Sequence, residues 1–248
     1  MKRVLEICAN SAQSCVEAEM GGAARVELCA GIPEGGTTPS YGEIRMAQQL
    51  TEAIDINVLI RPRGGDFLYT ENEVQSMLYD IEMCKDLNVH GVVFGCLQEN
   101  GDLDIDLMER LKDAAGTLSV TCHRAFDVCR DPFKTMEELV RLGVDRILTS
   151  GQQNSAVKGA ELLAELQRQA AGRIRIQAGG GICADAIREL YPKTGVTAYH
   201  MSGKIELASP MQYRKENVNM GLPSLSEYTL YRTDVKAVRS ARAVLEEL

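Results

Sequence analysis

The sequence predicts an α/β protein, a (β/α)8 TIM barrel formed by a single domain over residues 1–248. Short apolar segments suited to eight strands alternate with helical segments at a spacing of roughly 25 residues. The length of 248 residues is usual for this barrel, and no linker divides the chain. A doubly wound open sheet is the alternative, but the residues after the first strand, 8–11, lack the glycine fingerprint of that fold.

The composition indicates an ordinary globular protein and excludes some partners. Hydrophobic residues make up 45% of the chain and charged residues 25%. The net charge of −8 comes without a basic block, so we expect no nucleic-acid or membrane partner. The apolar run at the N-terminus is too short for a signal peptide. The eight cysteines form no CxxC pair, which favours reduced thiols and a cytoplasmic location.

The expected strands share short runs of apolar or alternating residues that end in a polar loop. They cover residues 3–8, 25–29, 57–61, 91–95, 118–123, 146–149, 173–178 and 196–201.

The expected helices follow these strands, and several have clear start signals. They cover residues 11–20, 41–50, 71–86, 104–115, 132–142, 156–171 and 184–191. Ser40 suits an N-cap, and Thr70 with Glu73 has the pattern of a capping box. Pro132 fits the first turn of its helix.

The pattern changes after Met201. Residues 202–232 form a polar, helix-poor excursion with Pro210 and Pro223, and residues 233–248 predict a terminal helix. Long irregular segments are often functional, so we expect the excursion to cover the barrel mouth or to form a subunit contact.

Alternation with a period of two sorts each strand into an outward set that meets helices and an inward set that fills the barrel. The inward set is unusually polar. It contains Glu6, Glu27, Arg61, His123, Gln177 and His200, and the loop groups Arg63, Asp66 and Asp127 follow at the same end.

Two interpretations of these polar residues remain open. They form either a self-satisfied ring of ion pairs that fixes the barrel, or a ligand site. Barrel enzymes place their chemistry at the carboxyl ends of the strands, which favours a site there. In an enzyme, Glu27 or His123 would serve as general acid or base.

The stretch VLIRPRGGDF, residues 58–67, suggests an anion-binding corner, since Arg61 and Arg63 leave a strand beside two glycines. The loops after the seventh and eighth strands form the usual phosphate pocket of such barrels. In this chain those loops carry Gly179, Gly180, Gly181 and Ser202. Solvated or structurally paired arginines and a tight glycine turn are the alternatives.

Cys8 and Cys29 are predicted to face inward at the same level of neighbouring strands. Two thiolates, or thiolates with an imidazole, suit a soft ion such as Cu(I). Cysteine also packs as a small hydrophobe, and neighbouring glutamates are expected to raise the pKa of the thiols.

The strings LEICAN, VELCAG, EGGTTPS, IRPRGGDF, HRAFD, LTSGQ and ASPMQYR resemble the copper homeostasis protein CutC family, in order and across most of the chain. The resemblance implies a TIM-type barrel, a cytoplasmic location, a homodimer and a role in copper homeostasis. It also implies copper binding through cysteines, which here are Cys8 and Cys29.

Three hypotheses follow. The first is a protein that binds Cu(I) through Cys8 and Cys29, with or without a histidine. The second is an enzyme that acts on a phosphorylated or carboxylated small molecule at the carboxyl end of the barrel. The third is a non-catalytic barrel that works through its dimer surface.

Overall fold

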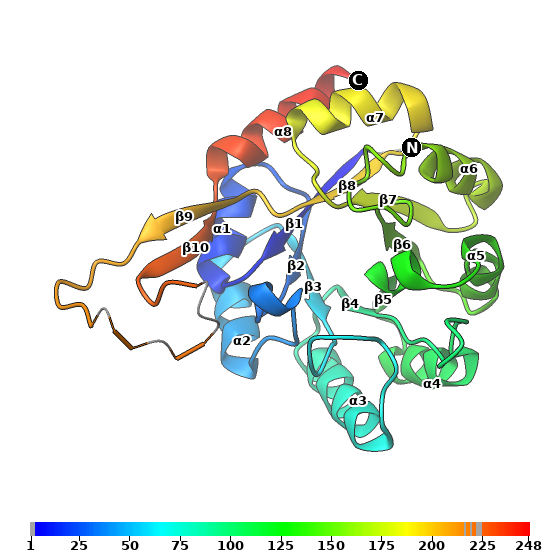
Figure 1. Ribbon diagram of the computed structural model, residues 1–248, viewed down its shortest axis with the longest axis horizontal. Coiled ribbons are helices and arrows are strands. Elements are labelled where there is room, and N and C mark those ends of the chain that lie inside the picture. The colour runs from blue at the N-terminus through cyan, green and yellow to red at the C-terminus, as the bar shows by residue number, and fades with distance from the viewer. Residues whose placement is uncertain (1–2, 216, 219, 222–224) are drawn as a thin grey trace.

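A computed structural model describes residues 3–215, 217–218, 220–221 and 225–248. Eight parallel strands close into a barrel with neighbours in chain order, and helices surround it (Figure 1). The predicted fold class is therefore confirmed. The strands are β1 (Val4–Ala9), β2 (Arg25–Leu28), β3 (Asp55–Leu59), β4 (Gly91–Phe94), β5 (Ser119–Cys122), β6 (Arg146–Thr149), β7 (Arg175–Gly179) and β8 (Ala198–Met201).

The helices cover the outside of the barrel. They are α1 (Ala12–Met20), α2 (Tyr41–Leu50), α3 (Glu71–Asp86), α4 (Ile105–Ala115), α5 (Pro132–Arg141), α6 (Ala160–Ala170), α7 (Ala184–Thr194) and α8 (Val235–Glu247). Two short 3-10 helices, η1 (Ile32–Glu34) and η2 (Arg124–Val128), lie in the loops after β2 and β5. Among the described residues, no helix has the length and apolar character needed to cross a membrane.

The predicted helix starts are confirmed where the signal was local. The Ser40 side chain accepts a hydrogen bond from the Glu43 amide, and Thr70 with Glu73 forms the complete capping box. Local start signals of this kind depend on neighbouring residues alone, so a sequence predicts them well.

Two predicted helix boundaries are wrong. Helix α6 begins at Ala160, not at residue 156, because the Ala156 amide donates to the Gly180 carbonyl and holds that stretch against the loop after β7. Helix α7 continues past Pro192 to Thr194, and Gly195 in a left-handed conformation ends it.

The predicted inward and outward sets are confirmed by two separate apolar clusters. Leu5 and Ile7 belong to the layer between strands and helices. Cys29 packs with Leu59 and Val93 in a smaller cluster inside the barrel, with Cys8 against it. The period-two sorting therefore places the polar groups of these strands in the barrel interior.

The lower layer of the interior is a hydrogen-bonded network around Glu6. Arg25 forms an ion pair with the Glu6 carboxylate, and Arg25 also donates to Gln177 Oε1 at 2.9 Å. Gln177 and His200 both bond Glu6 Oε1, the latter through Nδ1 at 2.7 Å. Burial alone would raise the pKa of Glu6, but Arg25 and His200 lower it well below its usual range.

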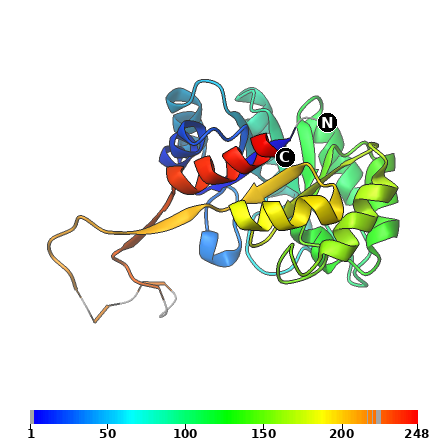
Figure 2. The same cartoon turned by 90° about the horizontal axis from the view of Figure 1, so that it is seen from above.

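The segment between β8 and α8 is less irregular than predicted. It contains an antiparallel hairpin, β9 (Lys204–Ala208) with β10 (Thr229–Thr233), which projects away from the barrel (Figures 1 and 2). The alternating stretch KIELA accounts for β9, because apolar Ile205 and Leu207 recur with period two. One expectation was that this segment covers the barrel mouth, but among its described residues only the base of the hairpin borders the mouth.

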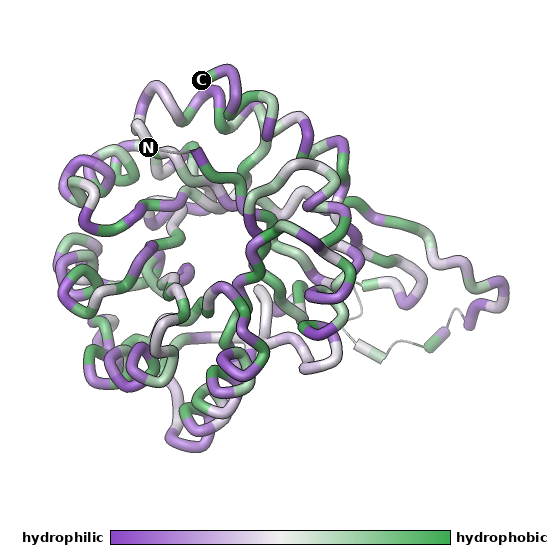
Figure 3. The backbone as a smooth tube through the Cα atoms, turned by 180° about the vertical axis from the view of Figure 1, so that it is seen from behind, coloured by the Kyte–Doolittle hydropathy of each residue, from purple (hydrophilic) through white to green (hydrophobic). Residues whose placement is uncertain are grey.

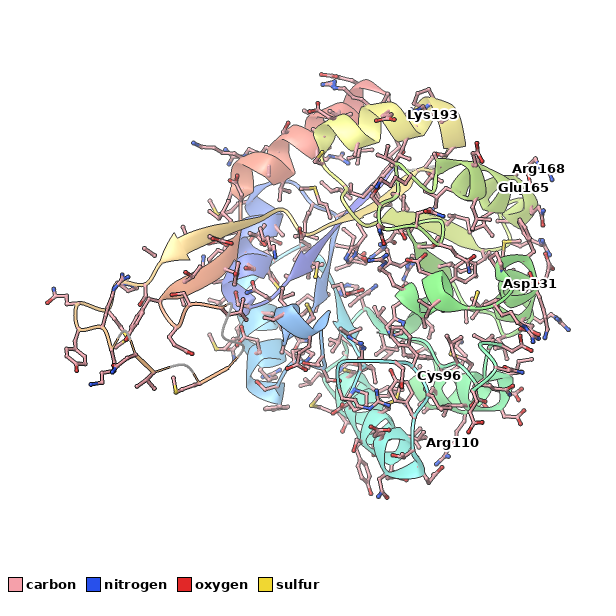
Figure 4. All side chains as sticks on the ribbon, in the orientation of Figure 1. Cys96, Arg110, Asp131, Glu165, Arg168 and Lys193 are labelled. Atoms are coloured by element: carbon pink, nitrogen blue, oxygen red, sulfur yellow. The ribbon has the colours of Figure 1, made fainter. Side chains whose placement is uncertain are left out.

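We predict that Arg25→Met lowers the free energy of unfolding by about 3 kcal/mol, because it leaves the buried Glu6 carboxylate without its guanidinium. Urea denaturation measures the loss. Arg110→Met is the control, since Arg110 pairs with Glu71 on the exposed periphery (Figure 4) and its loss should be nearly neutral. Equal losses in both variants would contradict the importance of the Glu6 network.

Candidate functional site

The upper layer of the barrel interior brings three metal-ligating side chains together. Cys8 on β1 is the register partner of Glu27 on β2, and His200 on β8 is the partner of Glu6 one layer below. One ligand atom each of Cys8, Glu27 and His200 lies within 4.8 Å of the other two. Because these strands are adjacent in the barrel, the cluster forms at the carboxyl ends of the strands, where the sequence predicted a site.

Cys29 adds a second thiol. Its Sγ lies 3.5 Å from Sγ of Cys8, and it also contacts the Ala9 carbonyl oxygen at 3.5 Å. Cys29 is buried, whereas Cys8 is partly exposed at the mouth. All eight cysteines of the chain are free thiols. The predicted inward pair is therefore close enough for both sulfurs to contact one ion.

The two thiols have opposite protonation preferences. The hydrogen bond with Cys29, together with the smaller effect of His200, lowers the pKa of Cys8 to about 5 against the effect of burial. The pKa of Cys29 is raised, because Cys29 donates to Cys8 and is buried. Glu6 raises the pKa of Cys8 as expected, but Cys29 and His200 outweigh this effect. Near neutral pH the pair holds one thiolate and one thiol.

His200 links the two layers of the interior. Its Nδ1 bonds the Glu6 carboxylate, and one ring nitrogen lies within 4.8 Å of the ligand atoms of Cys8 and Glu27. Burial opposes protonation, but Glu27, Cys8 and Glu6 together raise the pKa of His200 well above its ordinary value. A carboxylate behind a histidine fixes the ring orientation and is a common arrangement behind metal ligands.

Glu27 is buried without a hydrogen-bond partner at Oε2. Burial raises the pKa of its carboxyl to about 8. The group is therefore mostly protonated at neutral pH and can act as a proton donor, consistent with one of its predicted roles. A neutral carboxyl is a poor ligand for a soft cation.

His123 stands at the start of η2, across the mouth from the thiols. Its Nδ1 accepts a hydrogen bond from the Ala125 amide at 3.2 Å, so the neutral ring carries its proton on Nε2. Nε2 has no partner. Burial, with the nearby Arg61 cation, lowers the pKa of His123 to about 3. The ring can therefore donate a hydrogen bond, but it is a weak base.

Arg61 is buried directly after β3, and its terminal nitrogens bond only backbone among the described residues. It donates to the carbonyls of Glu34, Gly36 and Gly65 at 2.7–3.1 Å. Its guanidinium also lies over the Phe67 ring, 5.0 Å from the centroid.

Gly36 has φ of +93°, and a Cβ there would approach Leu59 to 2.8 Å, so the EGGTTPS loop needs this glycine to close over Arg61.

These groups surround a cavity of about 120 Å³ at the barrel mouth. Its lining combines the polar groups above with apolar walls. The lining residues are Cys8, Glu27, Gly35, Leu59, Arg61, Phe67, His123, Arg124, Leu148 and His200. A neighbouring cavity of about 220 Å³ also reaches Cys8 and is bordered by Ser202 and the base of the hairpin.

Other predicted site residues lie away from this cavity. Arg63 pairs with Glu73 at 2.5 Å and with Asp66 at 3.0 Å, and Asp66 is largely exposed. Asp127 accepts hydrogen bonds from the Ser150 amide and hydroxyl and from Arg124. These interactions stabilise loops.

The glycine loop after β7 lies beside the site without lining the cavity. Gly179 is the register partner of His200, and Gly180 and Gly181 adopt left-handed conformations. A Cβ at Gly179 would approach Leu148 to 2.5 Å. Phosphate binding by Gly179, Gly180, Gly181 and Ser202 remains a prediction.

Sequence reasoning missed two functional neighbours. Arg25 has the same strand parity as Glu27, so period two could have identified it as inward. Phe67 contacts both Arg61 and His123, with its ring centroid 4.8 Å from that of His123. No periodic signal marks Phe67, since it lies in a loop.

The donor set fits Cu(I). Two sulfurs and an imidazole nitrogen are the soft and borderline ligands that this ion prefers. Cys8 is already deprotonated near neutral pH, and Glu6 holds His200 in a fixed orientation. The fold and the cluster thus define a TIM-barrel protein with a thiol–imidazole site at its mouth.

The comparisons agree with this class. The CutC family model matches residues 3–205, so the chain belongs to the CutC family. A CutC family protein of Parabacteroides distasonis is 64% identical over 241 residues, which cover 97% of this chain and 99% of the relative. One of Chromobacterium violaceum is 43% identical over the full length of both chains.

Solved structures extend this agreement to the fold. The putative copper homeostasis protein CutC of Streptococcus agalactiae superposes with a TM-score of 0.77 at 35% identity, covering 81% of this chain and 98% of that chain. A thiamine phosphate pyrophosphorylase of Pyrococcus furiosus, at 20% identity and a TM-score of 0.60, shares the barrel alone. The resemblance seen in the sequence is therefore confirmed.

We predict that alkylation of Cys8 by iodoacetamide has a pH midpoint near 5, because the thiolate is the reactive form. Peptide mass spectrometry follows the modification, with the exposed Cys183 as a reference for the reagent. His200→Gln should move the midpoint upward. The control His90→Gln, which removes an exposed imidazole paired with Asp55, should not. A midpoint near about 8.5, that of a free cysteine, would contradict the assignment.

Proposed function

We propose that this CutC family member binds Cu(I) in the cytoplasm through Cys8 and Cys29, with His200 as a third donor. The observation that carries the proposal is the sulfur–sulfur distance of 3.5 Å beside an imidazole at the barrel mouth. The free state of all eight cysteines supports a reducing compartment.

The protonation states describe how an ion would be taken up and released. Binding requires Cys29 and His200 Nε2 to lose their protons, whereas Cys8 is already a thiolate near neutral pH. Cu(I) therefore competes with two protons, and acidification favours its release. This exchange suits a protein that carries or buffers copper as cargo.

We predict that the double variant Cys8→Ser, Cys29→Ser loses Cu(I) affinity by about two orders of magnitude or more, because it removes both sulfur ligands. His200→Gln should cost about tenfold. An anaerobic titration against a competing chelator measures both losses.

The matched control for this titration is Cys15→Ser, Cys84→Ser, which alters two thiols buried between the strands and the helices. It should keep the wild-type affinity. A Cys8, Cys29 variant that binds as tightly as the wild type would reject these ligands.

We also propose that the β9–β10 hairpin forms the homodimer contact implied by the family resemblance. Leu207 and Leu230 are directly opposite in the register, and Ile205 shares their face; all three are exposed. Figure 3 shows hydrophobic residues continuing along the hairpin away from the barrel. An isolated two-stranded sheet is marginally stable, and a second copy of the same face would cover these side chains.

We predict that Leu207→Glu, Leu230→Glu converts the dimer to a monomer, because like charges would meet across the contact. Light scattering after size-exclusion chromatography measures the mass. Glu206→Gln, on the opposite face of β9, is the control and should leave the dimer intact. A monomeric wild type, or a double variant that stays dimeric, would count against this contact.

A further inference from the structure

The cavity at the barrel mouth contains buried polar atoms that the copper site does not use. Arg61 Nε and His123 Nε2 both lack a hydrogen-bond partner. Arg61 is 6% exposed and His123 is 5% exposed, and both line the same cavity. Buried donors are almost always satisfied in folded proteins, so two of them at one cavity indicate an absent acceptor.

The charge of Arg61 indicates that this acceptor is an anion. The partners of its terminal nitrogens are uncharged carbonyls. Among the described residues, no carboxylate lies within ion-pair distance of its guanidinium. A buried cation is normally paired with an anion, because desolvation without a counter-charge is costly. Arg63, two residues away, shows the contrast, since it pairs with both Glu73 and Asp66.

The orientation of both donors is fixed by the fold. The Ala125 amide donates to His123 Nδ1 and so leaves the ring proton on Nε2, in a ring that lines the cavity. The Phe67 ring contacts the His123 ring and lies under the Arg61 guanidinium. Pre-oriented donors of this kind give affinity because little conformational entropy is lost on binding.

The size of the cavity and its apolar walls limit the kind of ligand that it can hold. The cavity of about 120 Å³ corresponds to roughly four water molecules at about 30 Å³ each. Leu59, Leu148 and Phe67 supply apolar walls. Two free N–H donors match the two oxygens of a carboxylate, whereas a phosphate has more oxygens to satisfy.

We propose that this cavity binds the carboxylate group of a small carboxylic acid, with Arg61 Nε and His123 Nε2 as the donors to its oxygens. The apolar walls hold the short carbon chain of the ligand. This site faces the thiol cluster across the cavity, but its donors are distinct from the proposed copper ligands. The proposal does not depend on copper binding.

The test is isothermal titration calorimetry of the full chain with acetate, and with acetamide and inorganic phosphate for comparison. We expect acetate to bind, and acetamide and phosphate to bind at least about tenfold more weakly, as expected for loss of a charge-assisted hydrogen bond. Arg61→Gln should weaken acetate binding by about tenfold or more. The matched control Arg63→Gln should leave it unchanged.

A second measurement uses the wild-type protein, in case Arg61→Gln fails to fold. The chain has three histidines, so a long-range proton–nitrogen NMR spectrum can resolve each ring, with His123→Gln to assign its signals. We expect the His123 ring to carry its proton on Nε2 and to shift when acetate, but not acetamide, is added.

Several results would overturn the proposal. One is that acetate does not bind, or that acetamide or phosphate binds as tightly as acetate. Another is that Arg63→Gln loses as much acetate affinity as Arg61→Gln, or that the His123 ring signals do not shift when acetate is added. Copper titration of Arg61→Gln separates the two sites, because its Cu(I) affinity should equal that of the wild type whichever way acetate behaves.

Discussion

The buried carboxylate of Glu6 is the constraint on which the rest of the barrel interior depends. Arg25, Gln177 and His200 reach it from three other strands, so it ties β1, β2, β7 and β8 together at one level. A charge in this position is stable only when its partners are complete. The same network fixes the ring of His200, which lies beside the thiolate of Cys8. The geometry of the upper layer is thereby set by the lower one.

The two layers differ in how well their polar groups are satisfied. In the lower layer, both oxygens of Glu6 and the amide of Gln177 have partners. In the upper layer, Glu27, Arg61 and His123 each retain a buried atom without one. Structural networks are usually complete, whereas binding sites leave groups for a ligand. Of the two interpretations that the sequence left open, the complete lower layer therefore fits a structural network, and the incomplete upper layer is where we propose the ligand sites.

The sequence was a good guide wherever a short-range rule decided the outcome. Period two placed Glu6, Cys8, Glu27 and Cys29 inside the barrel, and capping patterns placed Ser40 and Thr70 at helix starts. The sequence did not predict the interactions that depend on loop conformation. The partners of Arg61 are carbonyls of the loops after β2 and β3, and their positions depend on backbone conformations such as that of Gly36. The pKa of Cys8 likewise depends on distances that no spacing in the sequence encodes.

The separation of charge across the mouth would allow the two proposed sites to coexist in one cavity. His200 is bonded to the Glu6 carboxylate and lies beside the Cys8 thiolate on the side of β1 and β8, so its positive charge is balanced before any ligand arrives. Arg61 stands on the side of β3 with backbone carbonyls as partners, and its charge is not balanced by a carboxylate of the described chain. In the two proposals an anion is drawn toward Arg61, and a soft cation toward the sulfurs. Because the carboxyl of Glu27 between them is mostly neutral near pH 7, it does not bridge the two halves. Electrostatics would thereby divide a single cavity between the two proposed sites.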